Sequence, residues 1–462
     1  MDVKEKEDQT MKFDEFKNAV IEAAKKAGLQ EYELYYMEES SESVASMAGA
    51  IEEFSSDVTG GASFRCKSGG KMGYCSTEQF SAEEALRLVE KAMENAATIE
   101  TEDEGVIFAG SPSYQEIKPR DTKLSSMAEM SKLALDLYDA AVKVDDKVQK
   151  SSQAQIAQGT TKVRLVNSSG LDLSSESTQQ VAFQSAVVRS GEEQFNSYEK
   201  ENGPFDKIDV EKLAKKAVEK ALDKISGAPV PSGSYPVVFD NTCFASLLAA
   251  FSGIFSAKNA QQGMSLLAGK EDQTIASEIV TLTDDPFYEE YETAFDGEGV
   301  ATYRKNVIEN GVFKTLLYNL TFAKKAGRET TGNGSRASYY APVEIAPFNF
   351  YLLPGEKEAD KLYEQASADG DGLALLITDL AGLHAGLNPI TGDFSLMASG
   401  YRLENGKKTT FVNGITVSGN FYELLKSIRL IGKDLDFGGF PHGFTRFGSP
   451  SIYVGKMPVA GK

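Results

Sequence analysis

The pattern of apolar residues changes once along this chain, and that change limits how the chain can fold. Before about residue 228, runs with the 3.6-residue period of a helix alternate with extended runs; after it, paired extended runs dominate. The segment "GAPVPSGSYP", residues 227–236, lies at the change and has the Pro, Gly and Ser content of a linker. We therefore expect an N-terminal α+β domain at 1–228 and a mainly β C-terminal domain at 229–462.

Four helices are expected in the N-terminal half. Apolar residues recur at helical spacing over residues 13–27 and 209–225, and a glycine follows each run. Two other helices are predicted by serines with a glutamate three residues later, which is the spacing of a capping box. These pairs are Ser81 with Glu84 and Ser126 with Glu129. Extended runs between the helices predict strands at 32–37, 58–76, 160–177 and 179–191.

Two Asn-Gly dipeptides indicate hairpins in the C-terminal half. They separate extended runs at 306–318 and 400–412, and Asn-Gly is the strongest short signal for a two-residue type I′ turn. Hairpins imply antiparallel strands, and the many glycines favour a curved, barrel-like sheet. Two helices are expected to pack on it, an amphipathic one over residues 242–257 and another near 420–428. The predicted fold class is α+β.

Charge and cysteine content narrow the possible partners. The chain has 68 acidic and 48 basic side chains, a net charge of −20, which repels nucleic-acid phosphates and anionic membrane surfaces. Direct binding to nucleic acid or to a membrane is therefore not expected. The first residues are charged rather than apolar, and the three cysteines form no C-x-x-C pair. Both features predict a reducing, cytoplasmic location.

Side chains able to perform catalytic or metal chemistry are scarce. The two histidines, His384 and His442, lie in glycine-rich segments, where an isolated histidine usually has a structural or surface role. Asp393 stands out among the carboxylates because it follows two tight turns and begins a strand, although bracing the turn is its simplest role. Since no zinc-ligand pattern occurs, no metal or cofactor is expected in this chain.

Several C-terminal segments resemble the TldD/PmbA family. They are "GLHAGLNPITGDFSLMASGYRLENGK" at 382–407, "ITVSGNFYELLKSI" at 415–428, "FDGEGVATYRKNVIENGVFKTLLYN" at 295–319 and "GSPSIYVGKMPVAG" at 448–461. The resemblance implies a cytoplasmic two-subunit zinc metallopeptidase that degrades or matures unfolded peptides, such as the antibiotic microcin. An older family name is modulator of DNA gyrase, and the acidic charge predicts that any effect on gyrase is indirect.

The TldD branch of that family carries H-E-x-x-x-H on the helix that opens its C-terminal domain, with a cysteine near the C terminus as a further ligand. Aligned with that motif, Ala249, Ala250 and Ile254 stand in place of His, Glu and His, and no cysteine follows Cys243. The chain thus resembles the metal-free branch, TldE or PmbA. The resemblance implies a heterodimer with a zinc-bearing TldD-like subunit and a shared peptide cavity. Four residues of the family motif are candidates to line it: His384, Asn388, Asp393 and Ser395.

Two other functions stay open on the sequence. A stand-alone scaffold or peptide-binding homodimer would purify with no peptidase chain. A self-sufficient hydrolase would use His384 with Asp393 or Asp379 and a nearby serine, and it would lose its activity in His384→Ala.

Overall fold

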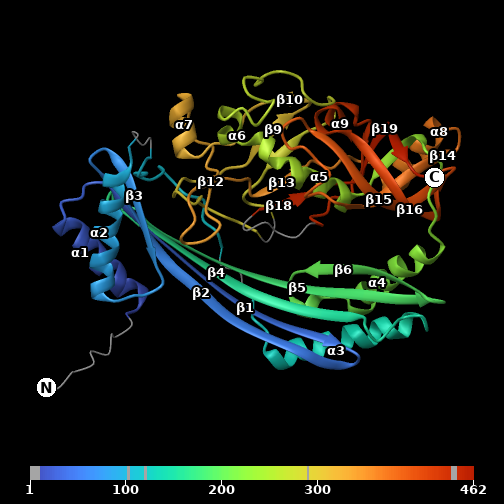
Figure 1. Cartoon of the computed structure of the whole chain (residues 1–462), viewed down its shortest axis with the longest axis horizontal. Coiled ribbons are helices and arrows are strands. Elements are labelled where there is room, and N and C mark those ends of the chain that lie inside the picture. Colours follow the sequence, from blue (N-terminus) through green and yellow to red (C-terminus); the bar gives the residue numbers. More distant parts are fainter. Residues whose placement is uncertain (1–10, 101–104, 119–121, 289–290, 439–444) are drawn as a thin grey trace.

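One long antiparallel sheet forms the frame of the N-terminal half in the computed structural model, which describes residues 11–100, 105–118, 122–288, 291–438 and 445–462. The sheet has six strands in the order β3-β2-β1-β4-β5-β6 and curves as a half-barrel (Figure 1). Its strands are β1 (Tyr32–Met47), β2 (Ala50–Ser68), β3 (Lys71–Thr77), β4 (Gln153–Asn167), β5 (Asp172–Ser190) and β6 (Glu193–Asn202).

Five of these strands overlap the expected extended runs, but the run expected at 58–76 spans the β2–β3 hairpin, and no run predicted β6. The run expected at 32–37 is the first third of β1, and the run expected at 160–177 spans the β4–β5 hairpin. The middle of β1 reads "EESSES". Because all six residues are polar, this segment lacks the alternation of apolar and polar residues that marks a strand, and it is only partly buried. Pairing with β2 and β4 along its whole length extends the strand there.

Four helices pack on this sheet, as the sequence predicts. Two pack near the end that carries β3, and two near the end that carries β6 (Figure 1). The capping box is complete at Ser126. At Ser81 the hydroxyl accepts from the N–H of Glu84, but the Glu84 carboxylate binds Arg87 instead of closing the box. The helices are α1 (Phe13–Lys26), α2 (Ala82–Thr98), α3 (Met127–Val144) and α4 (Val210–Asp223).

Five strands of the C-terminal half close into a barrel. Their order is β16-β15-β14-β7-β19, and β19 pairs again with β16 at Val417↔Val459. The β7–β14 pair is parallel and the other pairs are antiparallel, so the barrel-like, mainly antiparallel prediction is confirmed. The strands are β7 (Gly233–Phe239), β14 (Leu373–Ala381), β15 (Asp393–Glu404), β16 (Lys407–Asn420) and β19 (Ile452–Ala460).

A smaller sheet packs beside the barrel in the order β10-β9-β8-β13-β18. Both predicted Asn-Gly turns are present, with φ of 48° and 80° at Asn310 and Gly311 and of 51° and 79° at Asn405 and Gly406, as a type I′ turn requires. The remaining strands are β8 (Leu282–Asp284), β9 (Lys305–Glu309), β10 (Val312–Phe313), β11 (Gly334–Ser335), β12 (Glu344–Ile345), β13 (Asn349–Leu352), β17 (Leu430–Ile431) and β18 (Arg446–Gly448).

The C-terminal helices fill or cover the two sheets. Helix α5 lies in the core between them, with Phe251 stacked on Phe421 of α9 at 4.7 Å between ring centres. Helix α9 falls where a helix was expected, whereas α8 was not predicted. The helices are α5 (Asn241–Phe251), α6 (Ala257–Gln261), α7 (Leu320–Ala326), α8 (Ala359–Asp369) and α9 (Phe421–Ser427), and the 3₁₀ turns are η1 (Phe205–Lys207), η2 (Lys224–Ser226) and η3 (Ser252–Phe255). Over the described residues, none of the helices combines the length and the apolar character that a bilayer crossing requires.

Buried charges join the two halves at one end. Arg65 of β2 donates to both carboxylate oxygens of Glu33 in β1, at 2.8 and 2.9 Å. Arg336, from the C-terminal half, donates to the same carboxylate and to the carbonyl of Gly297. The three charged side chains are at most 3% exposed. Because a buried ion pair is stable only with its hydrogen bonds complete, this cluster fixes one half against the other.

Candidate functional site

Helix α5 is shorter and more buried than the sequence predicts. It begins after Asp240, whose carboxylate accepts from the N–H of Cys243 at 2.8 Å and from the hydroxyl of Thr242 at 3.1 Å. It ends at Phe251, and η3 follows, because Gly253 is a poor helix former. The amphipathic character is present, because the half-buried residues Thr242, Ser246, Ala249 and Ala250 share one side of the helix and the buried apolar residues occupy the other.

The three positions aligned with the metal motif carry apolar side chains in the structure. Ala249 and Ala250 are half-buried on the last turn of α5, and Ile254 is 1% exposed in the adjoining core. Zinc takes nitrogen, sulfur or oxygen ligands, so these residues do not fit a zinc ion. In the part of the chain that the structure describes, no three His, Cys, Asp or Glu side chains are grouped so that they could hold a metal.

The cysteine in α5 is also unsuited to metal binding. Burial raises the pKa of the Cys243 thiol well above its usual range, and the side chain is 3% exposed. Metal ligation requires the thiolate, which this environment disfavours. Cys243 therefore acts as a small apolar residue of the core.

Two of the candidate residues, Asn388 and Asp393, brace the turn between β14 and β15. The Asn388 amide oxygen accepts from the N–H groups of Ile390 and Thr391, at 3.0 and 3.2 Å. The Asp393 carboxylate accepts from the Thr391 hydroxyl and from the Asn420 amide, both at 2.8 Å, and these hydrogen bonds lower its pKa. The bracing role considered for Asp393 is thus present.

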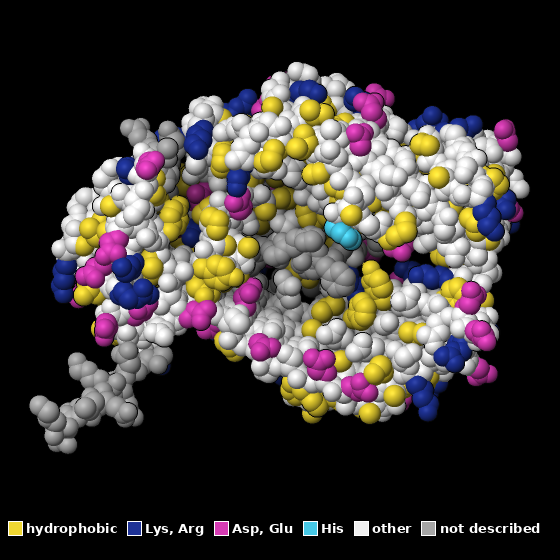
Figure 2. All heavy atoms as spheres, viewed as in Figure 1, with side chains coloured by type: hydrophobic (Ala, Val, Ile, Leu, Met, Phe, Trp, Pro, Cys, Tyr) yellow, Lys and Arg dark blue, Asp and Glu magenta, His cyan; other side chains and the backbone are white. Residues whose placement is uncertain are grey.

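Ser395 and His384 lie at the exposed surface of the same hairpin. The Ser395 hydroxyl is 3.0 Å from that of Ser418 on the neighbouring strand. His384 is exposed and is the cyan side chain of Figure 2. Contact of peptide with His384, Asn388, Asp393 and Ser395 stays a prediction. His442, the other histidine, lies outside the described residues.

The charged partners suggested for His384 are engaged elsewhere. Both oxygens of Asp393 accept hydrogen bonds, one from Thr391 in the turn and one from Asn420 at the end of β16. Asp379 lies in the lining of a cavity between the two halves and acts electrostatically on Lys224 and Tyr198. Neither aspartate has a described contact with His384. The His–Asp pair that a self-sufficient hydrolase would need is therefore not formed among the described contacts.

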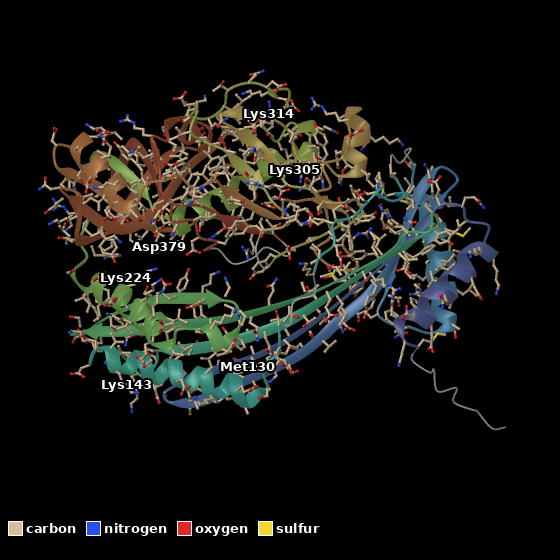
Figure 3. The ribbon with its side chains drawn as sticks, turned by 180° about the vertical axis from the view of Figure 1, so that it is seen from behind. Met130, Lys143, Lys224, Lys305, Lys314 and Asp379 are labelled. Atoms are coloured by element: carbon tan, nitrogen blue, oxygen red, sulfur yellow. The ribbon has the colours of Figure 1, made fainter. Side chains whose placement is uncertain are left out.

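A cavity of about 1010 Å³ lies between β6 and α4 on one side and the barrel with α5 on the other. Figure 2 shows the molecule hollowed between its two halves, and in Figure 3 Asp379 of β14 lies across from Lys224 of η2. The N-terminal part of α5 contributes Asp240, Thr242 and Ser246 to the wall. The helix that carries the aligned metal motif therefore borders the cavity with its first turns.

Strand β6 presents its free side to this cavity. It is the last strand in the sheet order of the described chain, and residues 196–202 all line the cavity. The N–H of Gly203 donates to the carbonyl of Gln180, which sets the alternation of inward and outward backbone groups along β6. The backbone groups of Asn196, Tyr198 and Asn202 then point away from β5, toward the free edge.

The two faces of β6 differ. Glu199 forms an ion pair with Lys220 of α4, so the odd-numbered side chains face that helix. Tyr198, on the opposite face, stacks on Phe183 of β5 at 5.3 Å between ring centres. Lys200 lies on the same face, where its ammonium group interacts electrostatically with Asp436 and Arg446 of the C-terminal half. Alternate side chains along β6 thus meet different walls of the cavity.

Burial changes the acid–base properties of several cavity groups. Burial raises the pKa of Asp240 to about 7, although its two hydrogen bonds and the charges of Lys220 and Lys408 act to lower it. Burial lowers the pKa of Lys200, Lys224 and Lys408. A poorly solvated ammonium group gains more from an anion than one in water does.

Sequence reasoning missed β6 and the polar face of α4 as parts of a site. The helix was predicted from its apolar residues, which pack on the sheet. Its opposite face carries a signal that was available in the sequence, namely lysines four residues apart from Lys212 to Lys224. The free edge of β6 had no such signal, because strand order is a property of the assembled sheet.

Three family signatures match the chain in order. They describe PmbA/TldA metallopeptidases and cover domain 1 at residues 32–96, the central domain at 120–225 and the C-terminal domain at 232–461. A Haemophilus influenzae protein named as a metalloprotease PmbA homolog is 25% identical over 454 residues, which cover 96% of this chain and 94% of that protein.

Solved structures show the same architecture. A Thermotoga maritima protein named as a candidate modulator of a DNA gyrase is 31% identical, with a TM-score of 0.86 over 97% of this chain and 100% of that one. TldE from Thermococcus kodakarensis has the same fold, with a TM-score of 0.85 and 22% identity over 96% of this chain and 99% of that one.

Proposed function

Because this chain belongs to the PmbA/TldD family of metallopeptidases, we propose that it is the metal-free, TldE-like subunit of a two-chain cytoplasmic zinc peptidase. In this role it forms a heterodimer with a TldD-like subunit and holds unfolded peptide for cleavage or maturation. The zinc belongs to that partner, where it would activate a water molecule for attack on the peptide bond when bound.

The observation that carries this proposal is the apolar chemistry of the motif positions. Ala249, Ala250 and Ile254 offer no ligand atom, and Ile254 is part of the core rather than of a pocket wall. A chain of a metallopeptidase family with such residues is better suited to binding than to hydrolysis. This supports a complex in which one chain binds the peptide and the other chain hydrolyses it.

The cavity supports the peptide-holding part of the role. An extended peptide can add to a free strand edge through backbone hydrogen bonds, which give affinity without requiring one sequence. The outward backbone groups of β6 lie in the cavity wall and could pair in this way. An unfolded segment has its backbone groups available along its whole length, whereas a folded protein offers them only at sheet edges, so unfolded peptides would be preferred.

The test is a purification of the tagged chain from its native cells. We expect a second chain with H-E-x-x-x-H to co-elute in a 1:1 ratio, and we expect zinc and peptidase activity in the pair. The matched control is the tagged chain purified alone, which should contain no stoichiometric zinc by mass spectrometry of the metal. Cleavage of an unfolded peptide by the isolated chain, or purification as a homodimer with no peptidase chain, would contradict the proposal.

A further inference from the structure

We propose that the cavity takes an extended polypeptide with carboxylate side chains at every second position, on the side that faces a row of lysines on α4. This lysine row consists of Lys212, Lys216 and Lys220 of α4 and of Lys224, which begins η2 directly after the helix, and all four line the cavity. The inference rests on the proposed function and names the class of peptide that the cavity prefers.

The lysine row forms one continuous stripe along the helix. Its members are four residues apart, so they lie on one side of α4, and the apolar side of the helix packs on the sheet. Like charges four residues apart repel one another and destabilise a helix. An anionic ligand along the row would relieve this repulsion.

The row runs along the free edge of β6. Lys220 forms an ion pair with Glu199, and Lys224 donates to the carbonyl of Asn196 at 2.7 Å. The two contacts run in opposite directions along the helix and the strand, so α4 lies antiparallel beside β6. Lys216 and Lys212 continue this row toward Asn202 and beyond. A peptide paired with β6 would have the row beside it over several residues.

The spacing of the row matches that of an extended peptide. Four residues of α-helix rise by about 6 Å. Two residues of strand, the interval between side chains on one face, span about 6.6–6.8 Å. Over three intervals the two patterns diverge by about 2 Å, which flexible lysine side chains can follow. Carboxylates at every second position would therefore each meet one lysine.

The charge of the cavity supports an anionic ligand. Eight basic and five acidic side chains line it, in a chain whose net charge is −20. On the side of the cavity that faces α4, Lys207 and the four lysines of the row give five positive charges. The negative charges on that side are two, those of Glu199 and Glu201. The other three acids, Asp240, Asp379 and Asp436, come from the C-terminal wall. The row thus keeps a positive excess where the peptide side chains would lie.

The test measures fluorescence anisotropy of labelled ten-residue peptides with the full chain. One peptide alternates Thr and Glu, a second has the same residues in two blocks, and a third alternates Thr and Gln. We expect the alternating Glu peptide to bind about three- to ten-fold more tightly than the Gln peptide at low salt, and this preference to fall as salt rises. The affinity of the block peptide should lie between the affinities of the other two peptides.

Two variants connect the preference to the row. Lys212→Glu with Lys216→Glu reverses two exposed members and should remove the three- to ten-fold preference. Lys215→Glu is the matched control, because Lys215 lies outside the cavity lining and faces Glu219 at 3.7 Å. An unchanged circular-dichroism spectrum and urea midpoint establish that each variant is folded.

The outcomes separate the inference from the function on which it rests. Equal binding of the Glu and Gln peptides, or an equal loss in Lys215→Glu, would overturn the preference and leave edge binding intact. Equal binding of the block and alternating peptides would overturn the spacing. If no peptide binds, both the inference and the peptide-holding role are wrong.

Discussion

Replacing Asp240 by asparagine should stabilise the protein, and should do so more at high pH than at low pH. Asp240 caps α5 at the cavity wall, and asparagine is an equally good cap. The substitution therefore keeps the two hydrogen bonds from Thr242 and Cys243 while removing a carboxylate that burial disfavours. The shape of the side chain is almost unchanged.

The magnitude follows from proton linkage. The pKa of Asp240 is raised from 3.8 to about 7 in the folded chain. The folded state then holds the proton more tightly than the unfolded state, so ionisation of Asp240 lowers the free energy of unfolding as the pH rises from about 4 to about 7. Between pH 5 and pH 8 ionisation of Asp240 lowers the free energy of unfolding by about 2 to 3 kcal/mol. In Asp240→Asn this loss is absent, because asparagine does not ionise.

The assay is urea unfolding of both proteins near pH 5 and near pH 8, followed by circular dichroism. Other titrating groups contribute equally to the two proteins, so the difference between them isolates Asp240. We expect the advantage of Asp240→Asn to grow by about 2 to 3 kcal/mol between the two pH values. An advantage that stays constant or shrinks would show that Asp240 is not held in an environment that disfavours its charge.

Three further expectations concern the core and the junction. In a urea titration with a chelator present, Ile254→His should lower the free energy of unfolding by about 3 to 5 kcal/mol, since it places an imidazole in the apolar core. The control Ala250→Ser, at a half-buried position, should lower it far less in the same titration. Arg336→Met should lower the free energy of unfolding by about 3 kcal/mol, because it removes a partner from a buried carboxylate; an unchanged urea midpoint would refute the role given to the junction. Iodoacetamide should label Cys75 faster than Cys243 in the native chain, by peptide mass mapping, since Cys243 is buried as a thiol.

The position of Ile254 explains why restoring the motif would not restore a metal site. A histidine at this position would have to replace a side chain that contacts the core on all sides. Because interiors are packed like crystals, such a change is opposed by the surrounding residues. The metal-free state of α5 is thus built into the packing around it.

The sequence by itself determined the features that depend on neighbouring residues. The Asn-Gly pairs specified type I′ turns, since asparagine and glycine tolerate positive φ at both turn positions. Ser126 and Glu129 specified a helix start through their own hydrogen bonds. The family resemblance and the lack of ligand atoms at Ala249, Ala250 and Ile254 could also be stated from residue identity alone.

Only the tertiary structure decided the features that depend on distant residues. The full length of β1 comes from pairing with β2 and β4, because its polar middle carries no periodic signal. Closure of the barrel joins β16 to β19, and the pairing of β6 with β5 leaves β6 at the sheet edge. The cavity exists because this edge and the lysine row of α4 face the barrel across it. Local sequence patterns encode turns and helix ends through short contacts, whereas strand order and cavity walls arise from long-range packing that no single segment contains.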